Sequence, residues 1–491
     1  MTQSVSTPYD FTTLAIAGQW RSGSAGTVMN VLDPYSGETV TSFGEAGLAD
    51  IDAAYQGAAA AQRDWAAALP VQRANVFRRA GEVMQARHDE IIDWLIREAG
   101  STRIKAEIEF GAVLASMLEA STLPSRLEGR ILGGDYPFKE NRIYRGPVGV
   151  VSVISPWNWP MHLSVRSIVP ALALGNGVVV KPAGETPITG GLLIARILEE
   201  AGLPPGLLAV VSGPVAVIGD YFVQHPASRV ISFTGSTKVG QHIGALAVTG
   251  PTLKKALLEL GGNGPFVVLD DADLDRAVQA AALSKFLHQG QMCIAANRII
   301  VMDAVHDAFV ERFTAYAAGL KVGDPKLPDT VIGPIITKKQ LTSIEGMVAT
   351  ARQEGARQRL GAPAQGLVLP PHIFDQVTPE MAIGRHEIFG PVAPIYRARD
   401  EAHALELAND TEYGLTSAVF SGSIERGAQF AKGVKAGMTH VNDVTAIDMP
   451  GLPFGGEKNS GLGRFGAAGV IEAFTTEHWI SIQHAAYPYP F

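Results

Sequence analysis

The feature that most constrains the fold is a series of short, continuously apolar segments separated by helical patterns. Residues 150–154, 178–181, 208–211 and 229–233 read as strands, and helical patterns such as 163–174 and 190–201 lie between them. A strand that is apolar at every position must be buried on both faces, which requires helices on both sides of a parallel sheet. We therefore predict an α/β domain that binds a nucleotide.

A second α/β series begins near residue 265 and includes strands at 298–301 and 417–420. Apolar positions at helical spacing predict helices between residues 51 and 99. Two segments depart from this alternation: a hairpin between residues 127 and 149, and a final strand at 479–483. Exposed edge strands tend to find partners, so these segments predict either an oligomer-bridging element or pairing within one domain.

Composition limits the function classes. The 491 residues carry a formal net charge of −8, which argues against a nucleic-acid partner. The first eight residues lack a basic region followed by an apolar run, and no apolar stretch is long enough to span a bilayer, so we expect no membrane association. The histidines do not cluster and there is one cysteine, which predicts no metal site and a reducing, cytoplasmic location.

The single cysteine, Cys293, follows Gly290, Gln291 and Met292 just beyond a helical pattern. Free cysteines are mostly small buried hydrophobic residues. However, Glu259 lies upstream beside Gly261 and Gly262, and a carboxylate near a thiol can serve as its base. The pattern favours a thiol nucleophile assisted by a glutamate.

Two glycine motifs compete for a phosphate-binding role. Residues 461–466 match the dinucleotide-binding pattern G-x-G-x-x-G. However, no strand is predicted before them and no βαβ unit around them, so we predict a glycine-rich surface loop there. Residues 233–237 follow a strand and open a helix, with Ser236 as a suitable N-cap and with Gly235 and Gly240 leaving room for close approach. A helix start of this kind binds anions, although an ordinary capped turn has the same pattern.

Taken together, the chain resembles the aldehyde dehydrogenase superfamily from about residue 11 to residue 483. The motifs that carry the resemblance occur in a specific order: Ser155-Pro156-Trp157-Asn158-Trp159-Pro160, Lys181-Pro182-Ala183, Phe233-Thr234-Gly235-Ser236-Thr237, Leu258-Glu259-Leu260-Gly261-Gly262, Gly290-Gln291-Met292-Cys293, Glu387-Ile388-Phe389-Gly390-Pro391 and Pro453-Phe454-Gly455-Gly456.

The resemblance implies an α/β aldehyde dehydrogenase-like fold with three parts. These are a Rossmann-type NAD(P)-binding domain (residues 1–126 and 148–258), a catalytic domain (259–474) and a bridging, oligomerisation element (127–147 and 475–491), usually in a homodimer or homotetramer. It implies that Cys293 is the nucleophile, Glu259 the general base and Asn158 the oxyanion donor. It also implies a site for NAD or NADP lined by Ile154, Ser155, Pro156, Trp157, Lys181, Gly184, Gly235, Ser236, Gly240, Leu260, Glu387 and Phe389.

Because thiol attack requires the thiolate, we expect a depressed pKa for Cys293. One departure concerns the cofactor. Many NAD-preferring members carry a glutamate where this chain has Gly184, followed by Glu185. Without that carboxylate a 2′-phosphate meets less repulsion, so NADP, or both cofactors, is expected.

Details such as Leu163-Ser164-Val165-Arg166-Ser167 and His440-Val441-Asn442-Asp443 resemble benzaldehyde and vanillin dehydrogenases. We therefore expect an aromatic aldehyde as substrate, oxidised to its acid through a thiohemiacetal and a thioester. Trp159, Met292 and Ile294 would form an apolar tunnel, and Arg166 would either meet a ring substituent or pair with a structural carboxylate. Three alternatives remain: CoA-acylating oxidation, an aliphatic or semialdehyde substrate, and a non-enzymatic protein of this fold.

Overall fold

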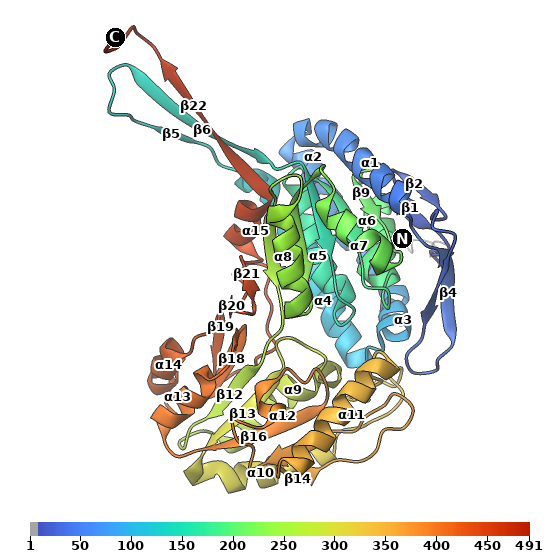
Figure 1. Cartoon of the computed structure of the whole chain (residues 1–491), viewed down its shortest axis with the longest axis vertical. Coiled ribbons are helices and arrows are strands. Elements are labelled where there is room, and N and C mark those ends of the chain that lie inside the picture. The colour runs from blue at the N-terminus through green and yellow to red at the C-terminus, as the bar shows by residue number, and fades with distance from the viewer. Residues whose placement is uncertain (1–7) are drawn as a thin grey trace.

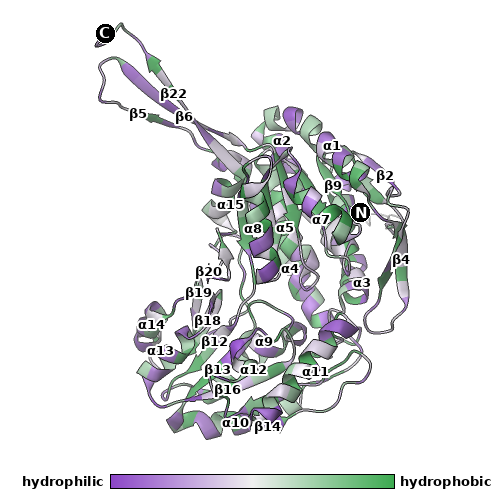
Figure 2. Ribbon diagram, in the orientation of Figure 1, coloured by the Kyte–Doolittle hydropathy of each residue, from purple (hydrophilic) through white to green (hydrophobic). Residues whose placement is uncertain are grey.

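The computed structural model describes residues 8–491, and two large sheets with their helices make up most of it (Figure 1). The absence of a secretory signal, predicted partly from residues 1–7, concerns positions outside the described range. In Figure 2 the central strands are mostly green and the helices that cover them carry both green and purple residues. The predicted α/β class is confirmed by this arrangement.

The first large sheet has the strand order β21-β11-β10-β7-β8-β9. Its strands are β7 (Val150–Ile154), β8 (Gly177–Lys181), β9 (Leu208–Val210), β10 (Ser228–Thr234), β11 (Lys255–Glu259) and β21 (Gly461–Leu462). All neighbours pair in parallel except β21, which runs antiparallel to β11. Every residue of β8 is buried although successive side chains point to opposite faces, so both faces are covered.

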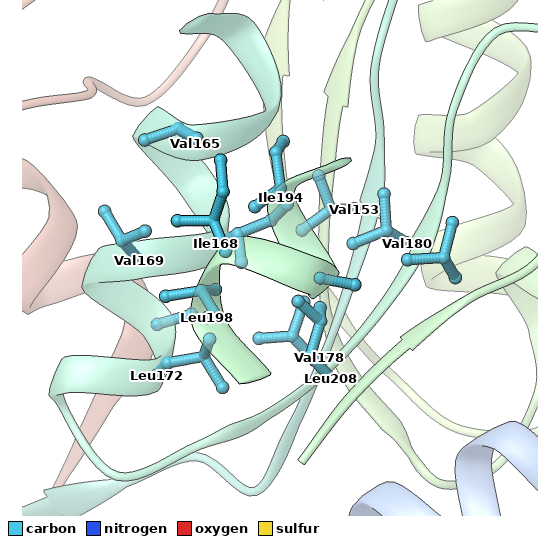
Figure 3. Close-up of a cluster of buried hydrophobic side chains, with 14 of the residues drawn as sticks. Val153, Val165, Ile168, Val169, Leu172, Val178, Val180, Ile194, Leu198 and Leu208 are labelled. Atoms are coloured by element: carbon cyan, nitrogen blue, oxygen red, sulfur yellow. The ribbon is translucent and has the colours of Figure 1, made fainter. Parts of the chain in front are cut away.

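Helices enclose this sheet. Those between its strands are α5 (Pro160–Ala173), the π-helical turn η2 (Ile188–Leu192), α6 (Leu193–Glu200), α7 (Val215–Gln224) and α8 (Thr237–Thr249). Figure 3 shows Ile168 and Leu172 of α5 packed with Leu198 of α6 against Val178 and Val180 of β8. The apolar runs that predicted a parallel sheet are therefore the interior of this layer.

The N-terminal part packs around the same sheet. It begins with the two hairpins β1 (Leu14–Ile16) with β2 (Gln19–Arg21) and β3 (Val28–Leu32) with β4 (Thr39–Gly44). The helices that follow are α1 (Leu48–Ala67), α2 (Pro70–Ala86), α3 (His88–Ala99) and α4 (Arg103–Ala120), ending in the 3-10 turn η1 (Leu123–Arg126). The helical prediction for residues 51–99 is confirmed.

The second large sheet has the order β14-β15-β16-β13-β12-β18-β19. Its strands are β12 (Gly264–Val268), β13 (Ala296–Met302), β14 (Arg357–Leu360), β15 (His372–Asp375), β16 (Val392–Ala398), β18 (Thr416–Phe420) and β19 (Met438–Val441). Its helices are α9 (Leu274–Phe286), α10 (Asp303–Ala318), α11 (Lys338–Gln353), α12 (Ala382–Arg385), α13 (Glu401–Asn409) and α14 (Ile424–Gly433). The 3-10 turn η3 (Leu287–Gly290) follows α9, and a short pair, β17 (Tyr413–Gly414) with β20 (Glu457–Lys458), lies beside the sheet.

A third sheet projects from the body (Figure 1). It consists of β5 (Arg130–Leu132), β6 (Lys139–Pro147) and β22 (Thr475–Gln483), with β6 antiparallel to both neighbours. The helix α15 (Ala467–Phe474) leads into β22. The predicted hairpin and final strand thus form one element, on which Ile131 and Trp479 are largely exposed.

The segment 461–466 differs from its prediction as a surface loop, because Gly461 and Leu462 form the edge strand β21 beside β11. Gly461 has φ of +149°, and a Cβ there would lie 2.2 Å from the carbonyl oxygen of Leu258. Glycine is required for this close approach, which pairs Gly461 with Glu259. The glycines therefore brace the end of β11.

None of the helices formed by residues 8–491 combines the length and the apolar character needed to cross a bilayer.

Candidate active site

The candidate site lies where parallel strands of the first sheet end. Thr234 at the end of β10 pairs with Glu259 at the end of β11, and Phe233 pairs with Ile154 at the end of β7. The loops that follow these strands carry Asn158, Gly235 and Leu260. Ligands of α/β proteins bind at this edge of the sheet, so the predicted motifs converge for a topological reason.

Cys293 reaches this edge through an unusual turn. His288, Gln289 and Gly290 after α9 have φ of +50°, +57° and +69°. At Gly290 a Cβ would lie 2.2 Å from the carbonyl oxygen of Gly390, so the turn can pass only with glycine. The Cys293 thiol donates a hydrogen bond to Oε1 of Glu259 at 3.2 Å. The predicted nucleophile and base are in direct contact.

The expected depressed pKa of Cys293 is wrong. Burial, together with the negative charges of Glu259 and Glu387, raises the pKa of this thiol well above its usual value, and Arg166 opposes them only in part. A buried thiol without a nearby helix N-terminus or an unpaired cation keeps its proton. The thiol therefore needs a base, and Glu259 is the carboxylate that accepts its hydrogen bond.

Asn158 is buried beside this pair. Its Nδ2 donates one hydrogen bond to the backbone oxygen of Gln291 at 2.9 Å, and its Oδ1 has no partner among the described residues. An amide nitrogen carries two hydrogens, so Nδ2 keeps one for another acceptor. This is the arrangement expected of an oxyanion donor.

Two residues that the sequence did not point to hold this loop. Glu109 of α4 accepts hydrogen bonds from the backbone N–H groups of Met161 and His162 at 2.9 and 3.0 Å, and thereby caps the start of α5. Lys105, fully buried, pairs with Glu109 and places its Nζ 4.7 Å from the ring centre of Trp159. Their Lys-x-x-x-Glu spacing was the available signal, but it is also typical of exposed helix faces.

Arg166 contacts the oxygen of Glu259 that the Cys293 thiol does not. Its guanidinium donates to Oε2 of Glu259 at 2.6 Å and to the Thr234 hydroxyl at 3.1 Å, and contacts Asp448 at 3.4 Å. Arg166 lies on α5, is only 7 % exposed and is not among the residues that line the apolar cavity beside Cys293. Its predicted alternative, pairing with a carboxylate, is the one observed, but the partner is the candidate base.

An apolar cavity of about 240 Å³ opens beside Cys293. Three predicted substrate residues, Trp159, Met292 and Ile294, line it together with Asn158 and Cys293. Sequence reasoning missed its remaining lining residues, which are Ile108, Ala112, His162, Leu163, Ala446, Ile447, Asp448, Met449 and Phe454. These come from α4, α5 and the segment 446–454. Leu163 and Phe454 belong to motifs that carry the resemblance, but no local pattern places the whole set around one cavity.

A second cleft, of about 330 Å³, also has Cys293 in its lining. Seven of the predicted cofactor residues line it: Pro156, Trp157, Gly235, Ser236, Leu260, Glu387 and Phe389. Ser236 occupies the N-cap of α8 but makes no side-chain capping bond, which leaves the first-turn N–H groups of α8 without that partner. Uncapped N–H groups at a helix start suit a phosphate, so these residues fit a dinucleotide.

The other five predicted cofactor residues lie outside this lining. Ile154 and Lys181 are paired across β7 and β8, and the backbone N–H of Ser155 donates to the Lys181 carbonyl oxygen. Burial lowers the pKa of Lys181, while nearby Glu185 favours its charged form. Gly184 is exposed, and a Cβ there would meet only Met29, at 3.7 Å.

Close packing explains the glycine at position 240, because a Cβ there would lie 2.2 Å from a methyl carbon of Leu260. Leu260 in turn lines the cleft. The glycine therefore sets how closely α8 approaches the loop after β11.

Glu387 connects the cleft to the thiol. Burial and the Glu259 charge raise its pKa to about 7, although the Gly262 N–H donates to it at 3.0 Å and Lys285 lies nearby. Phe389, two residues on, has φ of +52° and meets the Trp157 ring edge-on at 5.4 Å. A non-glycine residue in this region is strained, which is common where a site is preorganised.

Within residues 8–491, no three histidine, cysteine or acidic side chains gather as a metal site would require.

Comparison with known proteins agrees with this geometry. The model of the aldehyde dehydrogenase family matches residues 20–480. The chain is 48 % identical to a vanillin dehydrogenase of Corynebacterium glutamicum over 97 % of this chain and 98 % of that one. The crystal structure of an NAD-dependent benzaldehyde dehydrogenase from the same species is 45 % identical, covers 99 % of each chain and superposes with a TM-score of 0.91.

The structure of a salicylaldehyde dehydrogenase from Pseudomonas putida G7, complexed with salicylaldehyde, is 35 % identical, with a TM-score of 0.94 over 98 % of this chain and 99 % of that one. The family relationship and the fold therefore agree along nearly the whole chain, and the two cavities at Cys293 are consistent with them. The chain belongs to the aldehyde dehydrogenase family and is an NAD(P)-dependent aldehyde dehydrogenase.

Proposed function

We propose that this enzyme oxidises an aromatic aldehyde to its carboxylic acid, with Cys293 as the nucleophile. The observation that carries the proposal is that the apolar cavity and the cofactor cleft share Cys293, Asn158 and Leu163 in their linings. A substrate carbonyl in one space and a cofactor ring in the other can therefore both reach Cys293. The apolar walls of the cavity suit an aromatic ring, and relatives carry names of vanillin, benzaldehyde and salicylaldehyde dehydrogenases.

The chain's own groups account for the first step. Glu259 takes the proton of the Cys293 thiol through the 3.2 Å hydrogen bond as the sulfur adds to the aldehyde carbon. The carbonyl oxygen becomes an alkoxide, to which the second N–H of Asn158 donates. A fixed donor of this kind contributes about 3 kcal/mol in comparable sites.

Trp157, Phe389 and the N-terminus of α8 would hold the dinucleotide, which would supply the hydride acceptor needed to oxidise the thiohemiacetal carbon to a thioester. Glu259 first releases the thiol proton to solvent and can then take a proton from a water molecule as its oxygen adds to the thioester carbon. The C–S bond breaks, the acid leaves, and the Cys293 thiolate takes the proton back from Glu259. A base in this position supports hydrolysis rather than transfer to CoA.

For the cofactor we propose that both NAD and NADP are accepted. The exposed Gly184 supplies no carboxylate to repel the 2′-phosphate of NADP. The next residue, Glu185, would bind the ribose hydroxyls of NAD in place of a glutamate at position 184. The other predicted cofactor residues would hold the dinucleotide through the α8 N-terminus and the walls formed by Trp157 and Phe389.

For the assembly we propose the three parts predicted from the sequence and a homodimer or homotetramer. The projecting sheet of β5, β6 and β22 supports this, because its strand edge and exposed Ile131 and Trp479 offer an apolar surface to a second copy. Light scattering on the purified protein tests it, and a monomer at micromolar concentration would contradict it. We further propose that the enzyme acts in the reducing cytoplasm, where its one thiol stays free.

The test of the function is NAD(P)H absorbance on mixing enzyme, benzaldehyde and each cofactor. We expect turnover with a free-acid product that added CoA does not change, and none with Cys293→Ala. Equal rates for wild type and Cys293→Ala would refute the thiol mechanism. A panel of aromatic and aliphatic aldehydes tests the substrate class, which fails if aliphatic or semialdehyde substrates give the higher kcat/KM.

A further inference from the structure

We propose that Arg166 is a positioning residue that fixes the Glu259 carboxylate and pairs it with a buried cation, so that one oxygen remains free to act as base. The inference deepens the proposed function and rests on the role of Glu259 in it. The first observation is that the two oxygens of Glu259 have different partners. Oε2 accepts a hydrogen bond from Arg166 at 2.6 Å, and Oε1 accepts one from the Cys293 thiol at 3.2 Å. The carboxylate is thus held at one oxygen and available at the other.

The second observation is that Arg166 itself has little freedom. Its guanidinium lies 4.8 Å from the ring centre of Phe454 and 4.2 Å from that of Phe465. Asp448 contacts its second terminal nitrogen at 3.4 Å. A planar guanidinium held by stacking and by two carboxylates is a rigid anchor, unlike a lysine on a flexible stem.

Asp448 is fixed in turn. Although burial disfavours its charge, His162 and Arg166 together hold the pKa of Asp448 below its usual value. Nε2 of His162 lies 2.8 Å from the Asp448 carboxylate. A chain of polar groups, of which only Asp448 is partly exposed, therefore runs from His162 through Asp448 and Arg166 to Glu259.

The charges around Glu259 explain why an anchor is needed. Glu259 is fully buried and faces the Cys293 thiol, with Glu387 as a second acidic group close enough to interact with it. Burial and a neighbouring carboxylate both disfavour an ionised base. Arg166 supplies the cation in direct contact, and the Thr234 hydroxyl that it also binds is neutral. Lys285 acts from farther away, through Glu387.

The test compares Arg166→Met, Arg166→Gln and Arg166→Lys with wild type, using benzaldehyde and NAD. Both the single-turnover burst of NADH and the steady-state kcat are measured between pH 5 and 10. A buried carboxyl that loses a contacting cation generally ionises only at higher pH. We expect the acid limb of both profiles to move up by about one to three pH units in the Met and Gln variants, and kcat at pH 7 to fall at least about tenfold. The KM for benzaldehyde should change much less than kcat.

Arg166→Lys should keep the limb near its wild-type position because it keeps the charge, with a lower kcat from poorer geometry. The matched control is Arg73→Met, which removes another buried guanidinium, on α2, whose terminal nitrogen binds the carbonyl oxygen of Ala66. It should lower stability without moving the pH profile. If Arg166→Met does not fold, the Gln variant carries the same comparison.

Three results would overturn the proposal: an unmoved acid limb in the neutral variants, a rise in KM with kcat retained, or an equal shift in Arg73→Met. A rise in KM with kcat retained would indicate that Arg166 contacts the substrate instead. Failure of the proposed function is distinguishable, because wild type would then fail to oxidise benzaldehyde; the pH comparison would be made on the aldehyde that it does oxidise.

Discussion

Breaking the buried pair of Lys105 and Glu109 should lower both stability and activity. Both side chains are fully buried, and Glu109 also caps the first turn of α5 through Met161 and His162. The pair is therefore part of the support for the loop that carries Asn158. Lys105→Met leaves a buried carboxylate without its cation, whereas Lys105→Met/Glu109→Gln removes both charges.

The size of the effect follows from the burial. Removing one partner of a buried ion pair costs about 3–5 kcal/mol, and the two N–H donors that Glu109 retains favour the lower end. For a chain of 491 residues the unfolding entropy is about 1 kcal/mol per kelvin, so Tm should fall by about 3 °C. The double variant should be more stable than the sum of the single changes by at least about 1 kcal/mol.

Scanning calorimetry and NADH formation with benzaldehyde measure the two effects. We expect kcat of Lys105→Met to fall about tenfold, because small displacements of positioning groups are costly. The control is Lys321→Met, which removes an exposed pair with Asp329 and should leave Tm within about 1 °C. If Lys105→Met behaves like this control in both assays, the pair does not support the site and the reasoning is refuted.

Four further outcomes are expected. Asn158→Ala should lower kcat by about 10²–10³-fold, measured with benzaldehyde at saturating cofactor. Glu259→Gln should slow the NADH burst at pH 7, and the burst should become faster with rising pH as more of the thiol ionises unaided, while steady-state turnover stays low; a burst unaffected at pH 7 would show that Glu259 is not the thiol's base. Gly184→Glu should reduce kcat/KM with NADP more than with NAD, since the exposed site admits the side chain; the opposite order would contradict it. Burial raises the pKa of Glu98 from 4.5 to about 7, so the unfolded chain loses this proton first and stability is lost as pH rises from about 4.5 to 7. In denaturant titrations over this pH range, the free energy of unfolding of Glu98→Gln should fall by about 3 kcal/mol less than that of wild type. The same pH dependence in both proteins would contradict the assignment.

Much of the fold was predictable because its signals are local. The apolar strands 150–154 and 178–181 correspond to β7 and β8, and the turn at Ser236 opens α8 where expected. Cys293, Glu259 and Asn158 also meet, because the ends of parallel strands bring the loops after them together. What the sequence did not contain was the environment of each group. The pKa of Cys293 depends on burial and on Glu387, which is far away in the chain, so the expected depression was reversed.

The charged residues show the same limit more sharply. Lys105 and Glu109 have the spacing of an exposed helix pair, yet they are buried because α4 packs against α5. Arg166 and Asp448 are separated by 282 residues, and no single-sequence pattern joins them. A buried cation needs partners that offset the cost of its burial, and for Arg166 one of those partners is the carboxylate of the candidate base. Chemistry-bearing residues in this chain were thus identifiable from motifs, whereas the charges that set their ionisation became visible only when the sheet brought distant segments into contact.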